Sequence, residues 1–120
     1  MKIVTIKELL NAEVLCGEEN LGKHVYSACG SDMMSDVLAY VKDQAVLLTG
    51  LVNAQVIRTA EMMDMVCIVF VRNKRPTQEM IDLAKESGIV LLGTDMRMYE
   101  ACGRLFTNGL VNGESHGKRS

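Results

Sequence analysis

The sequence predicts one α/β domain with a mostly parallel sheet. Three apolar runs, which begin at Ala45, Cys67 and Ile89, start 22 residues apart, and each is followed by a turn and an amphipathic helical pattern. The runs are continuously apolar, which is typical of strands buried on both faces. Because strand–helix–strand connections join parallel strands with one hand, we expect three consecutive strand–helix units in a compact, three-layer-like domain.

An amino-terminal helix and two short strands are expected before these units. The residues from Thr5 to Glu8 match a capping box, so we expect Thr5 to cap a first helix that ends near Asn11. Residues 13–16 and 24–29 predict two short strands joined by a polar turn. The apolar stripe of the first helix is formed by Ile6, Leu9 and Leu10.

A second helix is expected to begin at Ser31 or Asp32. Its apolar residues recur at helical spacing and predict one buried stripe, formed by Met34, Val37, Leu38 and Val41. A polar turn at residues 42–44 ends this helix and leads into the first of the three strand–helix units.

The three units alternate regularly. Their strands are predicted over residues 46–49, 68–72 and 90–93, and their helices around residues 54–64, 77–87 and 95–108. Pro76 precedes the second of these helices, Gly88 ends it, and Gly109 ends the third. The last helix carries an unbroken apolar stripe that we assign to the core: Met98, Ala101, Cys102, Leu105 and Phe106. Residues 1–110 are therefore expected to form the domain, and residues 111–120 a disordered tail.

Composition and charge exclude several classes of function. The chain has 120 residues and a formal net charge of -2, whereas a DNA-binding module usually has a basic footprint. Aromatic residues, which would stack on bases, make up only 4%. No apolar run approaches the roughly 18 residues of a membrane span, and the amino-terminus does not resemble a secretory signal. We therefore expect a cytoplasmic protein that binds neither nucleic acid nor membrane.

The candidate ligand site is the edge of the sheet where the three strands end. In open parallel sheets, ligands bind beyond the carboxyl ends of the strands, and helix amino-termini there attract anions. We predict that this edge binds a phosphate-bearing small molecule through hydroxyl, amide and cationic groups of Thr49, Gly50, Asn53, Arg72, Arg75, Thr94 and Arg97. The alternative is that the cations form a solvated loop and that Thr94 and Asp95 cap a helix.

Motifs for cofactors and catalysis are missing from the sequence. There is no G-x-x-x-x-G-K-[ST] loop and no G-x-G-x-x-G after a strand. His24 is the only histidine before the polar tail, and no serine or cysteine partner is placed by spacing. Asp32 and Asp36 lie one helical turn apart, which is more typical of capping and of a solvated face than of acid–base chemistry. We expect no cofactor and no enzymatic activity.

Sulfur-containing residues are numerous. The four cysteines are scattered without a C-x-x-C pair, so we interpret them as buried thiols rather than a metal or redox site. Most of the nine methionines should fill the core. Met33, Met62 and Met96 fall off the helical stripes and predict an exposed apolar patch, which we interpret as a homodimer interface.

The chain resembles the DRTGG domain family in three runs: SDMMSDVLAYV, AVLLTGLVNAQVIRTAEMMDM and CIVFVRNKRPTQEMIDLAKESGIVLLGTDMRMYEACGRLF. The resemblance covers roughly residues 1–110. It implies a compact α/β module, similar in fold to the amino-terminal domain of HPr kinase. Such modules are usually fused to other domains, as in CBS-containing pyrophosphatases and some phosphate acetyltransferases. There they are regulatory or structural rather than catalytic, tend to self-associate, and lie beside adenine-nucleotide-sensing domains.

Both signature pieces of the family are changed in this chain. We place the family's Asp-Arg after the first of the three strands, where this chain has Leu51-Val52. We place its Thr-Gly-Gly after the second strand, where this chain has Val71-Arg72-Asn73. Thr49-Gly50, just before the first position, is kept. A ligand role of the family therefore does not carry over to these positions.

Three functions follow as hypotheses. The first is a non-catalytic regulatory module that senses an anionic metabolite, for example an adenine nucleotide, and that self-associates. The alternative is a protein-interaction subunit of a larger enzyme complex without a small-molecule ligand. The least favoured is a metal or redox accessory protein that uses Cys16, Cys29 and His24. A regulated enzyme would be reached in trans or through dimerisation.

Overall fold

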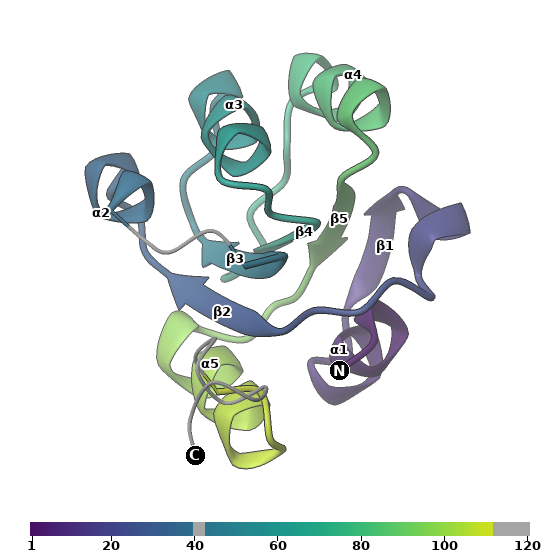
Figure 1. Cartoon of the computed structure of the whole chain (residues 1–120), viewed down its shortest axis with the longest axis vertical. Helices are drawn as coiled ribbons and strands as arrows, with labels where there is room; N and C mark the ends of the chain where they lie inside the picture. Colours follow the sequence, from purple (N-terminus) through teal and green to yellow (C-terminus); the bar gives the residue numbers. More distant parts are fainter. Residues whose placement is uncertain (40–42, 112–120) are drawn as a thin grey trace.

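The computed structural model describes residues 1–39 and 43–111 of the chain (Figure 1). Five strands form one sheet in the order β1-β5-β4-β3-β2. Their bounds are β1 (Glu13–Cys16), β2 (Ser27–Gly30), β3 (Ala45–Thr49), β4 (Cys67–Phe70) and β5 (Val90–Gly93). Strands β2 to β5 are parallel to one another, and β1 is antiparallel to β5. The predicted mostly parallel sheet is confirmed. Val41, Lys42 and the predicted tail beyond residue 111 lie outside the described residues.

The central strands are buried on both faces, as their apolar runs predict. Every residue of β3 and β4 is buried. Val46 pairs with Cys67, and Cys67 pairs with Val90. Alternate side chains enter two separate apolar clusters: Leu48 packs on one side of the sheet and Leu47 on the other. A strand between two helical layers needs apolar residues at every position, which explains the absence of polar alternation.

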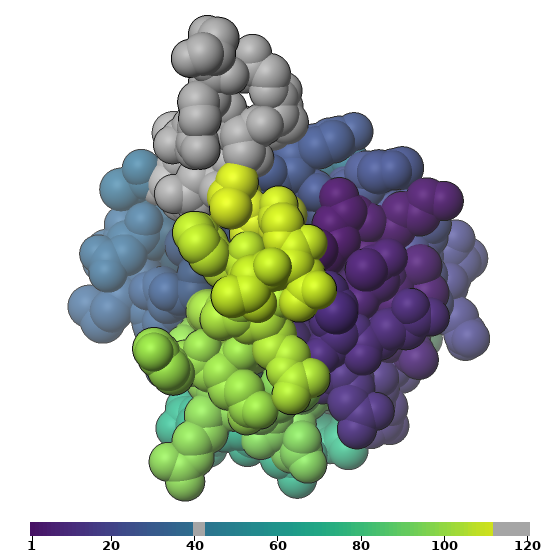
Figure 2. Space-filling model, turned by 90° about the horizontal axis from the view of Figure 1, so that it is seen from below, coloured from purple at the N-terminus to yellow at the C-terminus, as the bar shows by residue number. Residues whose placement is uncertain are grey.

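Helices cover both faces of the sheet and complete three layers (Figure 1). Their bounds are α1 (Ile3–Leu9), α2 (Met34–Leu38), α3 (Ala54–Met62), α4 (Gln78–Ser87) and α5 (Met98–Thr107), and a short 3-10 helix, η1 (Glu18–Asn20), follows β1. Helices α2, α3 and α4 lie on one face, and α1 and α5 on the other. Figure 2 shows α1 and α5 side by side over their face. None of the helices within the described ranges combines the length and apolar character that a membrane crossing requires.

The start of α1 differs from the prediction, and the capping box at Thr5 is wrong. Helix α1 begins at Ile3, and no side chain caps it. Instead, the Ile3 N–H donates to the Lys23 carbonyl (3.0 Å) and the Val4 N–H to the Leu21 carbonyl (2.9 Å). Backbone carbonyls of a distant loop satisfy the first amides of the helix, so no capping side chain is needed.

Strand β2 is shorter than predicted and lies far from β1. The Val25 N–H donates to the Met1 carbonyl (2.7 Å), and the Met1 amino group donates to the Val25 carbonyl (3.1 Å). His24 forms an isolated bridge with Lys2. His24 and Val25 therefore pair with the amino-terminus, and β2 begins only at Ser27. The two short strands occupy opposite edges of the sheet.

Helices α3 and α4 agree with their predicted ranges to within two residues. The Thr77 hydroxyl oxygen accepts the Met80 N–H at the start of α4 (3.2 Å). Gly88 ends the helix with a φ of 72°, a left-handed conformation that glycine adopts without strain. The predicted stop at Gly88 is confirmed.

Helices α2 and α5 begin later than predicted, at Met34 and Met98. Ser31 does not cap α2: its hydroxyl accepts the Met33 N–H (2.9 Å) in a local turn. Residues 94–97 are not helical because they pair with the loop after β4, where the Arg72 N–H donates to the Met96 carbonyl (2.8 Å).

Two predicted core residues are exposed. Leu38 of α2 is 45% exposed and Phe106 of α5 is 64% exposed, whereas Val37, Ala101 and Leu105 are buried as expected. The described part of α2 is a short helix at an edge of the sheet, and α5 turns only a narrow stripe toward the core. The unbroken core stripe predicted for the last helix is therefore wrong at Phe106.

Candidate ligand-binding edge

The carboxyl ends of β3, β4 and β5 lie side by side. Thr49, the last residue of β3, pairs with Phe70 of β4, which pairs with Gly93 of β5. The loops that follow these strands therefore start at one edge of the sheet, as predicted. We call this region the carboxyl edge.

Two backbone hydrogen bonds join the loop after β4 to the loop after β5. The Arg72 N–H donates to the Met96 carbonyl, and the Asn73 N–H donates to the Thr94 carbonyl, both at 2.8 Å. Arg72 and Asn73 each have a φ of 57°, in the left-handed region that strains residues other than glycine. The pairing of the two loops holds these residues in that conformation.

A cavity of about 380 Å³ lies at the carboxyl edge and is lined by Arg72, Asn73, Asp95 and Arg97. Its lining residues are thus two arginines, one asparagine and one aspartate. Among the described residues, no carboxylate forms an ion pair with Arg97. Within residues 1–39 and 43–111, Arg97 thus has no ion-pair partner.

Asp32 is a member of this edge that the sequence did not identify. One oxygen of its carboxylate accepts the Gly50 N–H (2.7 Å) and the Thr49 hydroxyl (2.9 Å). The other oxygen lies 3.8 Å from Nη2 of Arg72. We expected Asp32 to begin a helix, but β2 runs parallel to β3 and delivers the residues after it to the same edge. If the position of β2 in the sheet had been known, Asp32 could have been assigned to the carboxyl edge from the sequence.

Gly50 allows Arg72 to reach Asp32. The Arg72 guanidinium lies against the α-carbon of Gly50, and a methyl group at residue 50 would overlap it. A glycine is needed here for close approach of a side chain. The side chain of Arg72 thus crosses from the loop after β4 to the start of the loop after β3.

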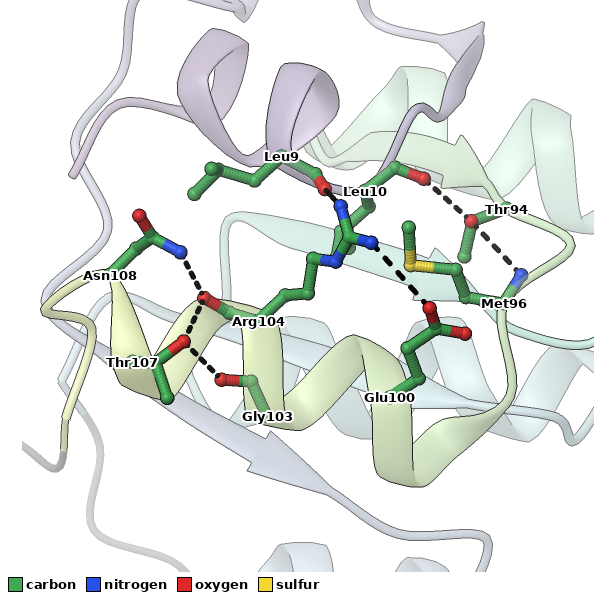
Figure 3. A network of polar contacts seen from close by, with 9 residues as sticks. All are labelled: Leu9, Leu10, Thr94, Met96, Glu100, Gly103, Arg104, Thr107 and Asn108. Carbon is green, nitrogen blue, oxygen red and sulfur yellow. Dashed lines mark hydrogen bonds and ion pairs between the residues drawn. The ribbon is translucent and has the colours of Figure 1, made fainter.

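The Thr94 side chain points toward the end of α1 (Figure 3). Only 3% of it is exposed. Its hydroxyl donates to the Leu10 carbonyl (2.8 Å) and accepts the Met96 N–H (3.2 Å). The same face carries Arg104, which donates to the Leu9 carbonyl at 3.3 Å. Thr94 therefore joins the loop after β5 to the end of α1 rather than facing a ligand.

Asn53 and Arg75 have other partners as well. The Asn53 side chain caps α3 by accepting the Val56 N–H (3.3 Å). Arg75 forms an ion pair with Glu13 of β1 at 2.9 Å. Of the residues predicted from sequence, the structure brings Arg72 and Arg97 to the cavity and places Thr49 and Gly50 beside Arg72.

The cysteines do not form a site. All four are free, and burial raises the pKa of every thiol, most strongly that of Cys67. Cys16 and Cys29 lie in β1 and β2, the opposite edge strands of the sheet. In the described part of the chain, no three histidine, cysteine or acidic residues are grouped as a metal site requires.

The topology defines an α/β domain with helices on both faces and its polar loops gathered beyond the carboxyl ends of parallel strands, the edge at which such sheets bind ligands. The DRTGG domain family matches residues 5–106, and the chain belongs to this family.

The chain shares its fold with a solved structure. It contains the CBS and DRTGG domains of the regulatory region of Clostridium perfringens pyrophosphatase, complexed with the activator diadenosine tetraphosphate. The TM-score is 0.69 at 19% sequence identity, and the match covers 95% of this chain but 49% of that chain. This chain thus spans about half of the neighbour's length. A search of curated proteins finds no significant match.

The backbone is left-handed where we place the family's second signature piece. We place the two glycines of the family's Thr-Gly-Gly at Arg72 and Asn73, and both residues have the left-handed conformation that glycine favours. In this chain the same backbone carries a guanidinium and an amide. The left-handed conformation at residues 72 and 73 therefore occurs here with side chains other than hydrogen, at the carboxyl edge.

Proposed function

We propose that the chain is a non-catalytic regulatory module that binds a phosphate-bearing small molecule at the carboxyl edge. The observation that carries this proposal is the convergence of Arg72 and Arg97 on one cavity. Guanidinium groups match the geometry of phosphate oxygens and bind them through paired N–H donors. The volume of about 380 Å³ lies within the range of small-molecule sites.

The other two residues of the cavity favour a nucleotide over inorganic phosphate. The Asp95 carboxylate would repel a bare phosphate but can accept hydrogen bonds from sugar hydroxyls. The Asn73 amide can donate to a phosphate or to a base. The structural neighbour was solved with diadenosine tetraphosphate, which supports adenine nucleotides as the first ligands to test.

Titration calorimetry with AMP, ADP, ATP, diadenosine tetraphosphate and pyrophosphate tests the proposal. Arg97→Ala should weaken binding by tenfold or more, because a hydrogen bond between charged groups contributes about 1.5–3 kcal/mol. Arg58→Ala is the matched control, since Arg58 is exposed on α3, away from the cavity. Absence of binding across the panel, or equal losses in both variants, would contradict the proposal.

Self-association is a second candidate function, and α5 is its best surface. Tyr99 is 92% exposed and Phe106 is 64% exposed. Both border a shallow apolar hollow together with Cys102 and Gly103. If two copies of α5 crossed antiparallel about a two-fold axis, Tyr99 of each copy would face Phe106 of the other. We propose this helix as the homodimer interface.

The methionines predicted as the interface do not form one patch. Met33 precedes α2 and Met62 ends α3, so these exposed residues lie toward opposite ends of their layer. Met96 packs against the apolar cluster on the other face of the sheet.

Sedimentation equilibrium near 100 μM distinguishes the two surfaces. The double variant Tyr99→Ser, Phe106→Ser should be monomeric, while Met62→Ser should sediment like the unaltered protein. A dimer that survives the double change would rule out the α5 interface, and a monomeric unaltered protein would rule out self-association.

The setting of the module is part of the same proposal. In the structural neighbour, the DRTGG domain belongs to the regulatory region of an enzyme. We propose that this chain likewise acts on an enzyme partner in trans, in the cytoplasm, where its four free thiols would remain reduced.

A further inference from the structure

The carboxylate of Asp32 already occupies an anion position at the carboxyl edge. It engages a backbone N–H, that of Gly50, at 2.7 Å, and a hydroxyl, that of Thr49, at 2.9 Å. It also lies 3.8 Å from the guanidinium of Arg72. Backbone amides, hydroxyls and guanidinium groups are the donors that proteins offer to phosphate oxygens. Asp32 thus holds a set of donors that an incoming phosphate could use.

Arg72 links this position to the cavity. Arg72 lines the cavity beside Arg97, and its guanidinium lies over Gly50 toward Asp32. Arg72 thus contacts the internal carboxylate and also borders the cavity. A phosphate bound to Arg72 would meet the charge of Asp32 at close range.

A ligand can replace Asp32 as the partner of Arg72. The two side chains are 50% and 48% exposed, and ion pairs at such positions are weak because water screens them. A polyphosphate carries more negative charge than a carboxylate and can contact Arg97 at the same time. Asp32 is also followed almost directly by α2, so its release would free the start of that helix from the end of β3.

We propose that Asp32 is an internal competitor for the ligand, and that binding of a polyphosphate displaces its carboxylate from Arg72, Gly50 and Thr49. Asp32 thereby lowers the affinity of the ligand-free protein for the polyphosphate. Its displacement also couples ligand binding to a movement of the residues that precede α2. This inference rests on the proposed binding function and names both a ligand class, compounds with at least two linked phosphates, and a route of regulation.

The test is a calorimetric titration of the full chain with pyrophosphate in three forms. Asp32→Asn removes the charge but keeps an oxygen that can accept the Gly50 N–H, so the fold is preserved. Asp36→Asn is the matched control: it removes an equal charge on α2, at an exposed residue whose side-chain carboxylate forms no hydrogen bond or ion pair with the described residues. We expect Asp32→Asn to bind about tenfold more tightly and Asp36→Asn to remain within twofold.

The Gly50 amide reports the displacement directly. In the unaltered protein, its resonance in a ¹H–¹⁵N spectrum should shift as pyrophosphate replaces the carboxylate. Equal or weaker binding by Asp32→Asn, or an unmoved Gly50 resonance, would overturn the inference and leave Asp32 as a group that positions Arg72. If neither form binds pyrophosphate or any nucleotide of the panel named above, the proposed function itself fails. If only Asp32→Asn binds pyrophosphate, the result would support Asp32 as a competitor. It would contradict ligand binding by the unaltered protein.

Discussion

Replacement of Thr94 by valine separates a structural role from a ligand-binding role at the carboxyl edge. The Thr94 hydroxyl donates to the Leu10 carbonyl (2.8 Å) and accepts the Met96 N–H (3.2 Å), in a site where only 3% of the residue is exposed. Valine has nearly the same shape but can make neither hydrogen bond. The Leu10 carbonyl and the Met96 amide would then lose a partner in the interior.

The expected loss of stability follows from these two bonds. Each contributes about 1 kcal/mol, and an unsatisfied buried partner adds to the loss, so Thr94→Val should lower the free energy of unfolding by about 2–3 kcal/mol. For a domain of this size, that corresponds to a fall in Tm of roughly 10 °C. Urea unfolding followed by circular dichroism measures the first quantity, and calorimetry the second.

Thr107→Val is the matched control. The Thr107 hydroxyl donates to the Gly103 carbonyl within α5 (2.9 Å), but in an exposed position where water can replace it. The control should change stability by less than about 0.5 kcal/mol. If Thr94→Val is as stable as the control, the buried network of Figure 3 does not join the loop to α1. Folded Thr94→Val should bind pyrophosphate as tightly as the unaltered protein. A large loss of affinity would show that Thr94 contributes to ligand binding.

Three further predictions follow from single residues. Gly50→Ala should separate the Arg72 guanidinium from Asp32, a change of only about 0.2–1 kcal/mol in stability measured by urea unfolding; a loss of several kcal/mol would count against the placement of Arg72. Asn73→Gly should stabilise the fold by about 0.5–1 kcal/mol in urea unfolding, because glycine relieves a left-handed φ of 57°; destabilisation would show that the amide side chain is needed. Burial raises the pKa of the Cys67 thiol, so it stays protonated at pH 8 and should react with a maleimide only in urea; rapid labelling of the native protein at Cys67 would contradict its burial.

The parallel sheet could be predicted because its signal is local. Strands buried on both faces must be apolar at every position. The runs containing Val46, Ile68 and Val90 can therefore be recognised as buried strands without knowledge of the rest of the chain. The helix limits at Thr77 and Gly88 are equally local, since each depends on one residue and its nearest neighbours.

Features that depend on distant segments could not be predicted. The first amides of α1 bind carbonyls of Leu21 and Lys23, so the capping chemistry of Thr5 was irrelevant. Asp32 reaches the edge only because β2 pairs with β3, and the sequence did not reveal where β2 lies. The side chain of Thr94 is turned toward α1 by contacts 84 residues apart in sequence.

Amide shift mapping with pyrophosphate over the whole chain tests the central claim most directly. If phosphate binds at the carboxyl edge, the largest shifts should occur at Gly50, Arg72, Asn73, Asp95 and Arg97, and should be absent in Arg97→Ala. Shifts gathered instead around Gln44 and Ile89, at the other ends of the strands, or no shifts at millimolar pyrophosphate, would contradict it.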